Sequence, residues 1–219
     1  MTPRKMHEGE VRTDAALVRR LLRDQFPKWA DLPIDRVPSD GTDNAIYRLG
    51  TDKAVRLPRI DWATGQVEKE HEWLPRLAPH LPLALPVPLA KGQPGAGYPW
   101  EWSVYEWLEG EDADIERMAD PRQAALDLAA FILALQRIDT SGAPTPRPDA
   151  VARGQPLAPR DEGTRRAIAT LRHEFDPQRM IAVWEAALDA PEWGGEPVWI
   201  HGDLKPGNLL AVDGRLSAV

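Results

Sequence analysis

The feature that most limits the fold of this sequence is a change of hydrophobic spacing near residue 108. Before that point, short strand-like runs are separated by turn residues and by two stretches with helical spacing. After it, most apolar residues recur at helical spacing. The pattern predicts an α+β protein in which a small, mostly antiparallel sheet precedes a mainly helical part.

The first part contains five runs with the composition of strands: 34–37, 45–49, 53–57, 85–89 and 102–108. Gly50, Thr51 and Asp52 separate the second run from the third, so these two runs are predicted to form a hairpin. Helical spacing occurs at 13–25, where Thr13 or Asp14 can cap the helix, and again at 64–77.

The second part begins with a strong helix start, because Asp120 can cap a first turn that opens with Pro121. Pro and Gly are dense at 141–163, which predicts a long surface loop. Asp213-Gly214 is a good hairpin signal. The remaining elements expected are helices at 121–138, 164–175 and 177–188 and strands at 198–200, 209–212 and 216–219.

Composition narrows the functional class. The 219 residues fit one domain or two small lobes, and the lack of cysteine excludes disulfides and thiolate metal sites. A net charge of -7 disfavours nucleic acid as a partner and favours attraction of a cationic substrate. The start of the chain carries charges, and no apolar run approaches about 18 residues. We therefore expect a cytoplasmic protein with no membrane span.

Residues 201–208, with the sequence HGDLKPGN, place chemically useful groups in a short loop. The Asp203 carboxylate can accept a proton from a substrate hydroxyl, and Asn208 offers a neutral oxygen that suits Mg²⁺. Lys205 can reach a transferring phosphate, and His201 is expected to brace the loop by hydrogen bonding. This combination suits phosphoryl transfer, which demands positioning and charge neutralisation more than covalent chemistry.

This loop resembles the catalytic loop shared by protein kinases and by the aminoglycoside phosphotransferase family, and Gly202 in its second place favours the latter. Upstream, SDGTDNAIYRLGTDKAVRLPR is similar to the nucleotide-loop hairpin of that family. Its turn would hold phosphate oxygens with backbone amides. The turn residues are Gly41, Thr42, Asp43 and Asn44.

Two further stretches resemble parts of the same family. Arg56 stands where kinases carry the strand lysine that pairs with nucleotide phosphates, and QVEKEHEWLPRL resembles the helix whose glutamate anchors that residue. The resemblance indicates Glu70 as the anchor, with Glu68 as the second choice. Arginine keeps the charge, but its planar head is not equivalent to an ammonium group.

SVYEWLEGE resembles the hinge between the lobes of these enzymes. There the carbonyl of Glu106 and the amide of Leu108 would pair with the adenine edge, and Tyr105 would line the base pocket.

The resemblance implies a protein-kinase-like fold with a nucleotide-binding lobe at 1–107 and a partial helical lobe at 108–219. It also implies ATP or GTP as phosphate donor, Mg²⁺ as cofactor, an aminoglycoside-like acceptor and a role in antibiotic resistance. The aspartate of the family's IDFG-like segment, a second metal ligand, is not found before Val219. The expectation is therefore a chain that is incomplete at its C-terminus and has impaired turnover.

Other interpretations stay open at this point. The chain can be a non-catalytic nucleotide-binding or interaction module, or a kinase for another small alcohol such as choline, homoserine or fructosamine. A truncated product that folds poorly would expose its final strand as an unprotected sheet edge. A hydrolase with His201 and Asp203 as metal ligands is the weakest alternative, because no other His or carboxylate lies nearby at ligand spacing.

Overall fold

A computed structural model describes residues 10–38, 43–144 and 154–219. It divides the chain into two compact units, one made of 1–138 and 203–219 and the other of 139–202. This partition differs from the predicted lobe boundary at residue 107, which stays a prediction. Among the described residues, none of the helices has the length and apolar character needed to cross a membrane.

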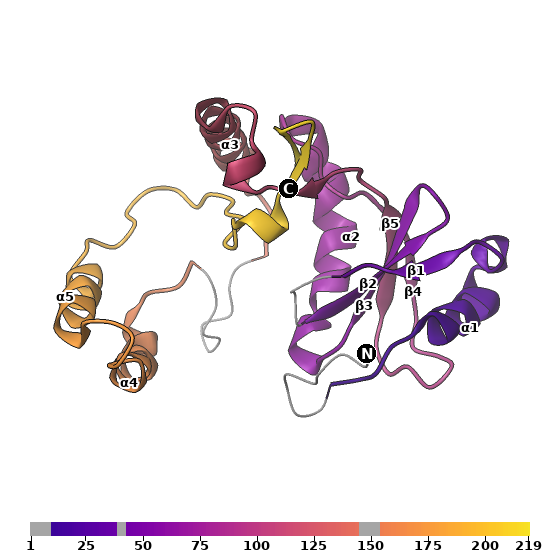
Figure 1. Ribbon diagram of the computed structural model, residues 1–219, viewed down its shortest axis with the longest axis horizontal. Coiled ribbons are helices and arrows are strands. Elements are labelled where there is room, and N and C mark those ends of the chain that lie inside the picture. The colour runs from indigo at the N-terminus through magenta and orange to yellow at the C-terminus, as the bar shows by residue number, and fades with distance from the viewer. Residues whose placement is uncertain (1–9, 39–42, 145–153) are drawn as a thin grey trace. The chain divides into compact units, whose positions relative to one another are not determined.

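The main sheet of the first unit is antiparallel, with the strand order β1-β2-β3-β5-β4 (Figure 1). Its strands are β1 (Ile34–Arg36), β2 (Asn44–Leu49), β3 (Lys53–Pro58), β4 (Pro88–Gly92) and β5 (Trp102–Glu106). The predicted β2–β3 hairpin is confirmed, since Leu49 pairs with Lys53 and Gly50 turns the chain with a positive φ of 62°. β4 starts three residues later than predicted, and the chain before it, at Ala84, pairs with the C-terminal strand.

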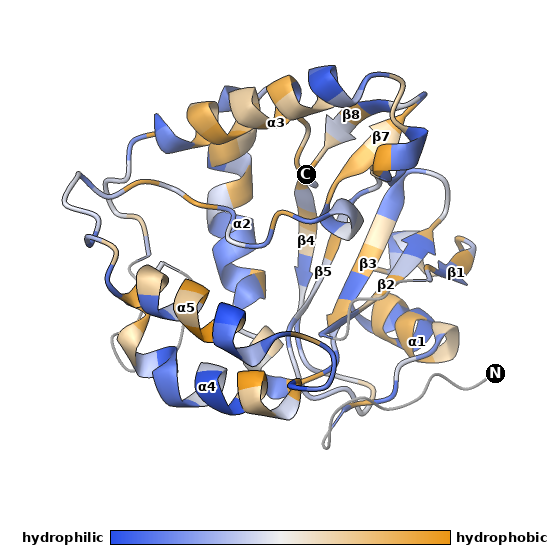
Figure 2. Ribbon diagram, turned by 60° about the vertical axis from the view of Figure 1, so that its left-hand side comes forward, coloured by the Kyte–Doolittle hydropathy of each residue, from blue (hydrophilic) through white to orange (hydrophobic). Residues whose placement is uncertain are grey.

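Helix α1 (Ala15–Gln25) covers one face of this sheet. The Asp14 side chain accepts a hydrogen bond of 2.7 Å from the Leu17 amide, which confirms one of the two predicted caps. Figure 2 shows apolar and polar bands alternating along α1, and its apolar face is buried against residues such as Val55 and Trp102. These contacts form the main apolar core of the unit.

Helix α2 (Gln66–Leu77) lies on the opposite face of the sheet, where Ser103 and Tyr105 of β5 point (Figures 1 and 2). His71 of this helix contacts the strand directly, with 3.0 Å between its Nε2 and the Ser103 Oγ. The two faces therefore differ, because α1 meets an apolar surface whereas α2 meets polar side chains.

A second sheet contains β6 (Glu111–Asp112), β7 (Leu210–Val212) and β8 (Arg215–Ala218) in that order. The predicted hairpin at its C-terminal end is confirmed, with φ of 49° at Asp213 and 72° at Gly214, as a two-residue hairpin turn requires. β6 was not predicted, because two exposed acidic residues carry no strand pattern.

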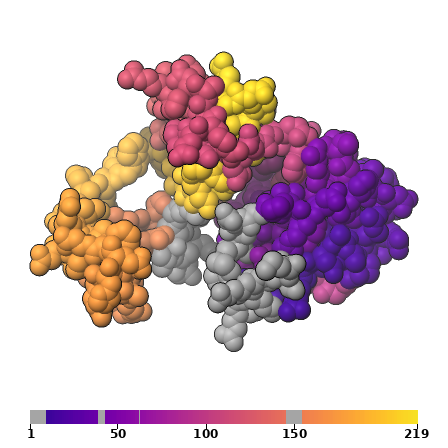
Figure 3. Space-filling view, in the orientation of Figure 1, coloured from indigo at the N-terminus to yellow at the C-terminus, as the bar shows by residue number. Residues whose placement is uncertain are grey.

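The outer edge of β8 is covered at its C-terminal end, which differs from the unprotected edge that a poorly folding truncated product would have. Ala84 forms a parallel bridge with Ala218, supported by hydrogen bonds of 3.0 Å from the Ala84 amide to Ser217 and from the Val219 amide to Ala84. Helix α3 (Pro121–Gln136), capped by Asp120 as predicted, lies beside β8 (Figure 3).

The second unit contains α4 (Asp161–Thr170) and α5 (Pro177–Leu188). The two helices are joined by polar contacts, among them a hydrogen bond of 2.7 Å from the Trp184 indole to Asp161. The strand predicted at 198–200 is wrong, because these residues pair with no neighbouring strand in the described chain. Short 3₁₀ turns complete the fold at Pro27–Trp29, Asp61–Ala63, Ala78–His80, Ile115–Arg117, Ala158–Arg160 and Pro206–Asn208.

Candidate active site

A charged pair joins the sheet to helix α2. The Arg56 Nη1 atom lies 2.8 Å from both carboxylate oxygens of Glu70, and the two side chains are 29% and 20% exposed. Burial alone would lower the pKa of Arg56, but the facing Glu70 carboxylate outweighs it and the net pKa is raised. Arg56 is therefore held as a fixed cation on the α2 face of the sheet.

The structure also distinguishes the two glutamates that the sequence offered as partners. Glu70 faces the sheet, whereas the Glu68 side chain is 73% exposed and lies 3.3 Å from Lys91. One turn of α2 thus carries two different carboxylates: that of Glu70 is shielded beside Arg56, and that of Glu68 is exposed to solvent.

Tyr105 completes a three-residue cluster with this pair. Tyr105 is 4% exposed, and its hydroxyl donates a hydrogen bond to the Glu70 Oε2 atom. Burial, and then the negative charge of Glu70, raise the pKa of the Tyr105 hydroxyl well above its ordinary value. The contact with Glu70 was missed at the sequence level, because nothing in the local pattern specifies which helix side chain the tyrosine meets. The predicted place of Tyr105 beside the base stays a prediction.

The loop from Asp203 to Asn208 is closed by its own side chains. The Asn208 Nδ2 atom donates to the Asp203 backbone carbonyl at 2.8 Å and to its Oδ2 atom at 3.0 Å. These bonds use the nitrogen end of the amide, so the oxygen end is the one oriented away from Asp203. The Asp203 and Asn208 side chains are both half-buried, whereas Lys205 is exposed.

The boundary between the two compact units falls inside the predicted motif. Asp203 begins the second segment of the first unit, and the exposed His201 belongs to the second unit. Gly202, at the junction, has a φ of 78°, which favours glycine at this position. The bracing role predicted for His201 stays a prediction.

Strand pairing connects the predicted hinge with the 203–208 loop. Glu111 and Asp112, just after the hinge, pair with Ala211 and Leu210, just after the loop. Gly110 has a φ of 143°, and a Cβ atom there would lie 3.0 Å from the Ala211 carbonyl oxygen. The close approach of the two segments thus depends on a glycine.

The predicted hinge residues differ in exposure, since Glu106 is exposed and Leu108 is half-buried. The Glu106 amide donates to the Val87 carbonyl at 2.9 Å, which fixes the start of the hinge on β4's leading segment. On the predicted nucleotide loop, Gly41 and Thr42 lie outside the described residues. Asp43 accepts a hydrogen bond of 2.7 Å from the Arg59 amide through its carbonyl, and Asn44 begins β2.

The chain is related to a known protein family. A family model described as the phosphotransferase enzyme family matches residues 35–219. The chain belongs to this phosphotransferase enzyme family. No curated protein matches it.

Solved structures similar to this family member include two antibiotic phosphotransferases of the aminoglycoside type. The GDP complex of wild-type aminoglycoside 2'-phosphotransferase-IIIa has a TM-score of 0.69 and 18% identity, over 94% of this chain and 72% of that one. The streptomycin–ATP–APH(2")-IIa ternary complex has a TM-score of 0.60 and 18% identity, over 95% and 70%.

A third similar structure is that of macrolide 2'-phosphotransferase MphH from Brachybacterium faecium, in its apoenzyme form. It has a TM-score of 0.58 and 25% identity, over 94% of this chain and 71% of that one. Together with the family match, these likenesses confirm the predicted α+β, protein-kinase-like fold.

Mg²⁺ is the cofactor that the family resemblance implies for this phosphotransferase family member. In the described parts of the chain there is no group of three or more His, Cys, Asp or Glu side chains that could hold a metal ion. Mg²⁺ takes six oxygens, and it is often held by one or two carboxylates together with phosphates and waters. Asn208 offers one amide oxygen, so the described residues do not form a metal site by themselves.

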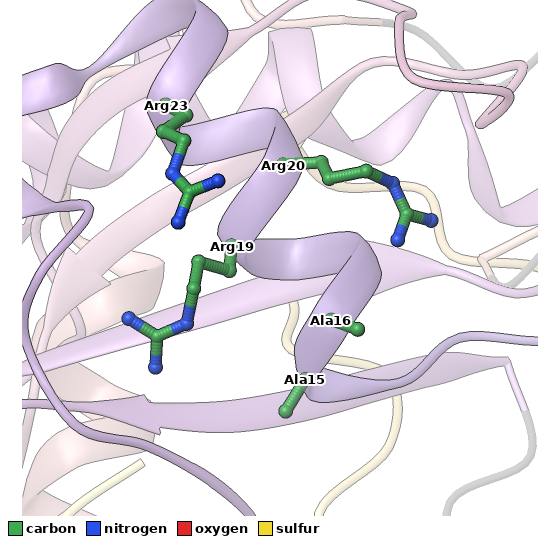
Figure 4. A pocket seen from close by; sticks show the side chains of 5 residues that line it. All are labelled: Ala15, Ala16, Arg19, Arg20 and Arg23. Atoms are coloured by element: carbon green, nitrogen blue, oxygen red, sulfur yellow. The ribbon is translucent and has the colours of Figure 1, made fainter.

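A surface hollow lies beside helix α1 of this phosphotransferase family member. Figure 4 shows Arg19, Arg20 and Arg23 extending from α1 beside Ala15 and Ala16. Because α1 covers the opposite face of the sheet from α2, these arginines are not part of the Arg56–Glu70 cluster.

Proposed function

We propose that this protein transfers the γ-phosphoryl group of ATP or GTP to a hydroxyl group of a small antibiotic-like molecule. The observation that carries the proposal is the occurrence in one compact unit of the Arg56–Glu70 pair and the Asp203–Asn208 loop. Similar folds solved with GDP and with ATP support a nucleotide as donor.

Arg56 is suited to hold phosphate oxygens. Its contacts with Glu70 use Nη1, and a guanidinium has further N–H donors in a fork that matches phosphate geometry. Glu70 restricts the rotation of a long side chain, so less conformational freedom is lost when phosphate binds.

Asp203 is proposed as the base. The acceptor hydroxyl oxygen forms a bond to the γ-phosphorus. At the same time, the bond between the γ-phosphorus and the oxygen that bridges it to the β-phosphorus breaks. The hydroxyl proton moves to the Asp203 carboxylate, and ADP or GDP leaves. Asn208 keeps the Asp203 carboxylate in place through its hydrogen bond of 3.0 Å.

The remaining roles follow the sequence-based predictions. The Glu106 carbonyl and the Leu108 amide would hold the base edge, Lys205 would approach the transferred phosphate, and the Asn208 oxygen would be one ligand of Mg²⁺. The net charge of -7 favours a cationic acceptor, and similar structures contain streptomycin or kanamycin.

The proposal is tested by following labelled γ-phosphate from ATP and from GTP to kanamycin, streptomycin and a macrolide. Asp203→Asn should reduce transfer by about 100-fold or more, because it removes the base, while nucleotide binding persists. Asp213→Asn is the matched control, since an exposed asparagine is tolerated in the same positive-φ turn and should leave transfer unchanged.

The same experiment distinguishes the enzyme from the main alternative, a non-catalytic nucleotide-binding module. Nucleotide binding without transfer to any acceptor would refute the enzymatic role and support a non-catalytic nucleotide-binding module. Transfer that is equally fast in Asp203→Asn would refute the role assigned to Asp203.

A further inference from the structure

The Arg56–Glu70 pair is held by a third residue that comes from a different strand. Tyr105 lies on β5, next to β3, and its hydroxyl meets the same Glu70 oxygen, Oε2, that Arg56 contacts. The Glu70 carboxylate is thus fixed between a cation and a neutral donor. Because Tyr105 is almost completely buried, its hydroxyl is shielded from water that could replace Glu70 as a partner.

We propose that Tyr105 is a positioning residue for nucleotide phosphates: it fixes the Glu70 carboxylate so that Arg56 presents its other guanidinium edge to the phosphates. The inference rests on the proposed function, and it adds a residue whose effect passes through Glu70 and Arg56. Tyr105 need not touch the phosphates to have this effect.

The geometry of the pair explains why a third group matters. Both Arg56 contacts use the same nitrogen, Nη1, so Glu70 holds the arginine at one point and not along a two-pronged edge. An arginine held at one nitrogen can turn about that contact. A carboxylate whose rotation is fixed by the Tyr105 hydroxyl limits this movement, and it leaves the Nε and Nη2 edge in one orientation.

The place of Tyr105 in the chain gives the contact a second consequence. It directly precedes Glu106, whose amide is bound to the Val87 carbonyl at 2.9 Å and whose carbonyl is the proposed partner of the base. One residue therefore joins the segment proposed to hold the base to the cluster proposed to hold the phosphates.

The test is calorimetric titration of the full chain with ATP, GTP, adenosine and guanosine, for wild type and variants. Tyr105→Phe should weaken binding of the preferred triphosphate about tenfold, as expected for a lost hydrogen bond to a charged group, and should change binding of the matching nucleoside less than twofold. Tyr47→Phe is the matched control, because it removes another buried tyrosine hydroxyl, bound to Thr13 at 3.0 Å on the opposite face of the sheet.

A double-mutant cycle distinguishes positioning through Arg56 from a purely structural role of Tyr105. In the Arg56→Ala background, Tyr105→Phe should have no further effect on triphosphate affinity, since Tyr105 acts through Arg56. If Tyr105→Phe does not fold, Tyr105→Met also lacks the donor and can fill the same apolar space.

Three outcomes would overturn the inference. The first is an equal loss of nucleoside and triphosphate affinity, which would mean that Tyr105 serves the base. The second is a tenfold effect that persists without Arg56, and the third is no effect of Tyr105→Phe in a protein that binds triphosphate through Arg56. In the third case the proposed function stands, whereas a wild-type chain that binds no nucleotide would remove both.

Discussion

Replacement of Glu70 by alanine is the most direct test of the charged cluster on the α2 face. The change would leave Arg56 without the carboxylate that lies 2.8 Å from its Nη1 atom, and Tyr105 without an acceptor in a site where it is 4% exposed. Both groups would be left partly desolvated and unpaired, which is the costly way to break an interaction.

The size of the effect follows from the burial of the pair. Removing one partner of a fully buried ion pair costs about 3–5 kcal/mol. Arg56 and Glu70 are 29% and 20% exposed, so water can recover part of that loss. We expect the free energy of unfolding to fall by about 2–3 kcal/mol, a shift of about 1 M or more in the urea midpoint for a small domain.

Glu68→Ala is the matched control, because it makes the same substitution on the same helix and has the same effect on helix propensity. Glu68 is 73% exposed and 3.3 Å from Lys91, so its removal should cost less than about 1 kcal/mol. Urea unfolding followed by circular dichroism measures both variants. Equal losses for the two would refute the argument that shielding makes the Glu70 cluster strong.

Two further predictions concern pH and backbone geometry. Burial raises the pKa of Tyr98 and of Tyr105 in the folded state, so the stability they contribute is present below pH about 10 and lost as the pH rises above it. Urea midpoints measured from pH 8 to pH 11 should fall above pH 10, and less steeply in Tyr98→Phe; a midpoint that stays constant would contradict the shifts. Gly110→Ala should destabilise the protein by about 1–3 kcal/mol, because it combines a φ of 143° with a 3.0 Å contact. Gly97→Ala, at φ of 83° but in open space, should cost less when both variants are compared by urea unfolding, and a reversed order would refute the role given to the contact.

Features with a local physical cause were predictable from the sequence. Asp120 followed by Pro121 fixed the start of α3, because a cap and a first-turn proline satisfy the helix end without help from the rest of the chain. Asp213-Gly214 fixed the last hairpin, because both residues accept positive φ. The HGDLKPGN motif likewise indicated the phosphotransferase family that the comparison confirms.

Features that depend on a distant partner were predicted less well. The run at 198–200 has strand-like residues but pairs with no other part of the described chain, whereas the acidic β6 became a strand because β7 lies beside it. A strand exists only as part of a ladder, so its own composition does not decide its state.

The sequence alone determined which chemical groups are present and in what order: a strand arginine, two helix glutamates and an aspartate in a loop. Tertiary structure decided which glutamate meets Arg56 and that Tyr105 joins them. The physical reason is that helix spacing leaves both Glu68 and Glu70 possible, and only the packing of α2 against β3 and β5 shields one carboxylate and leaves the other in water.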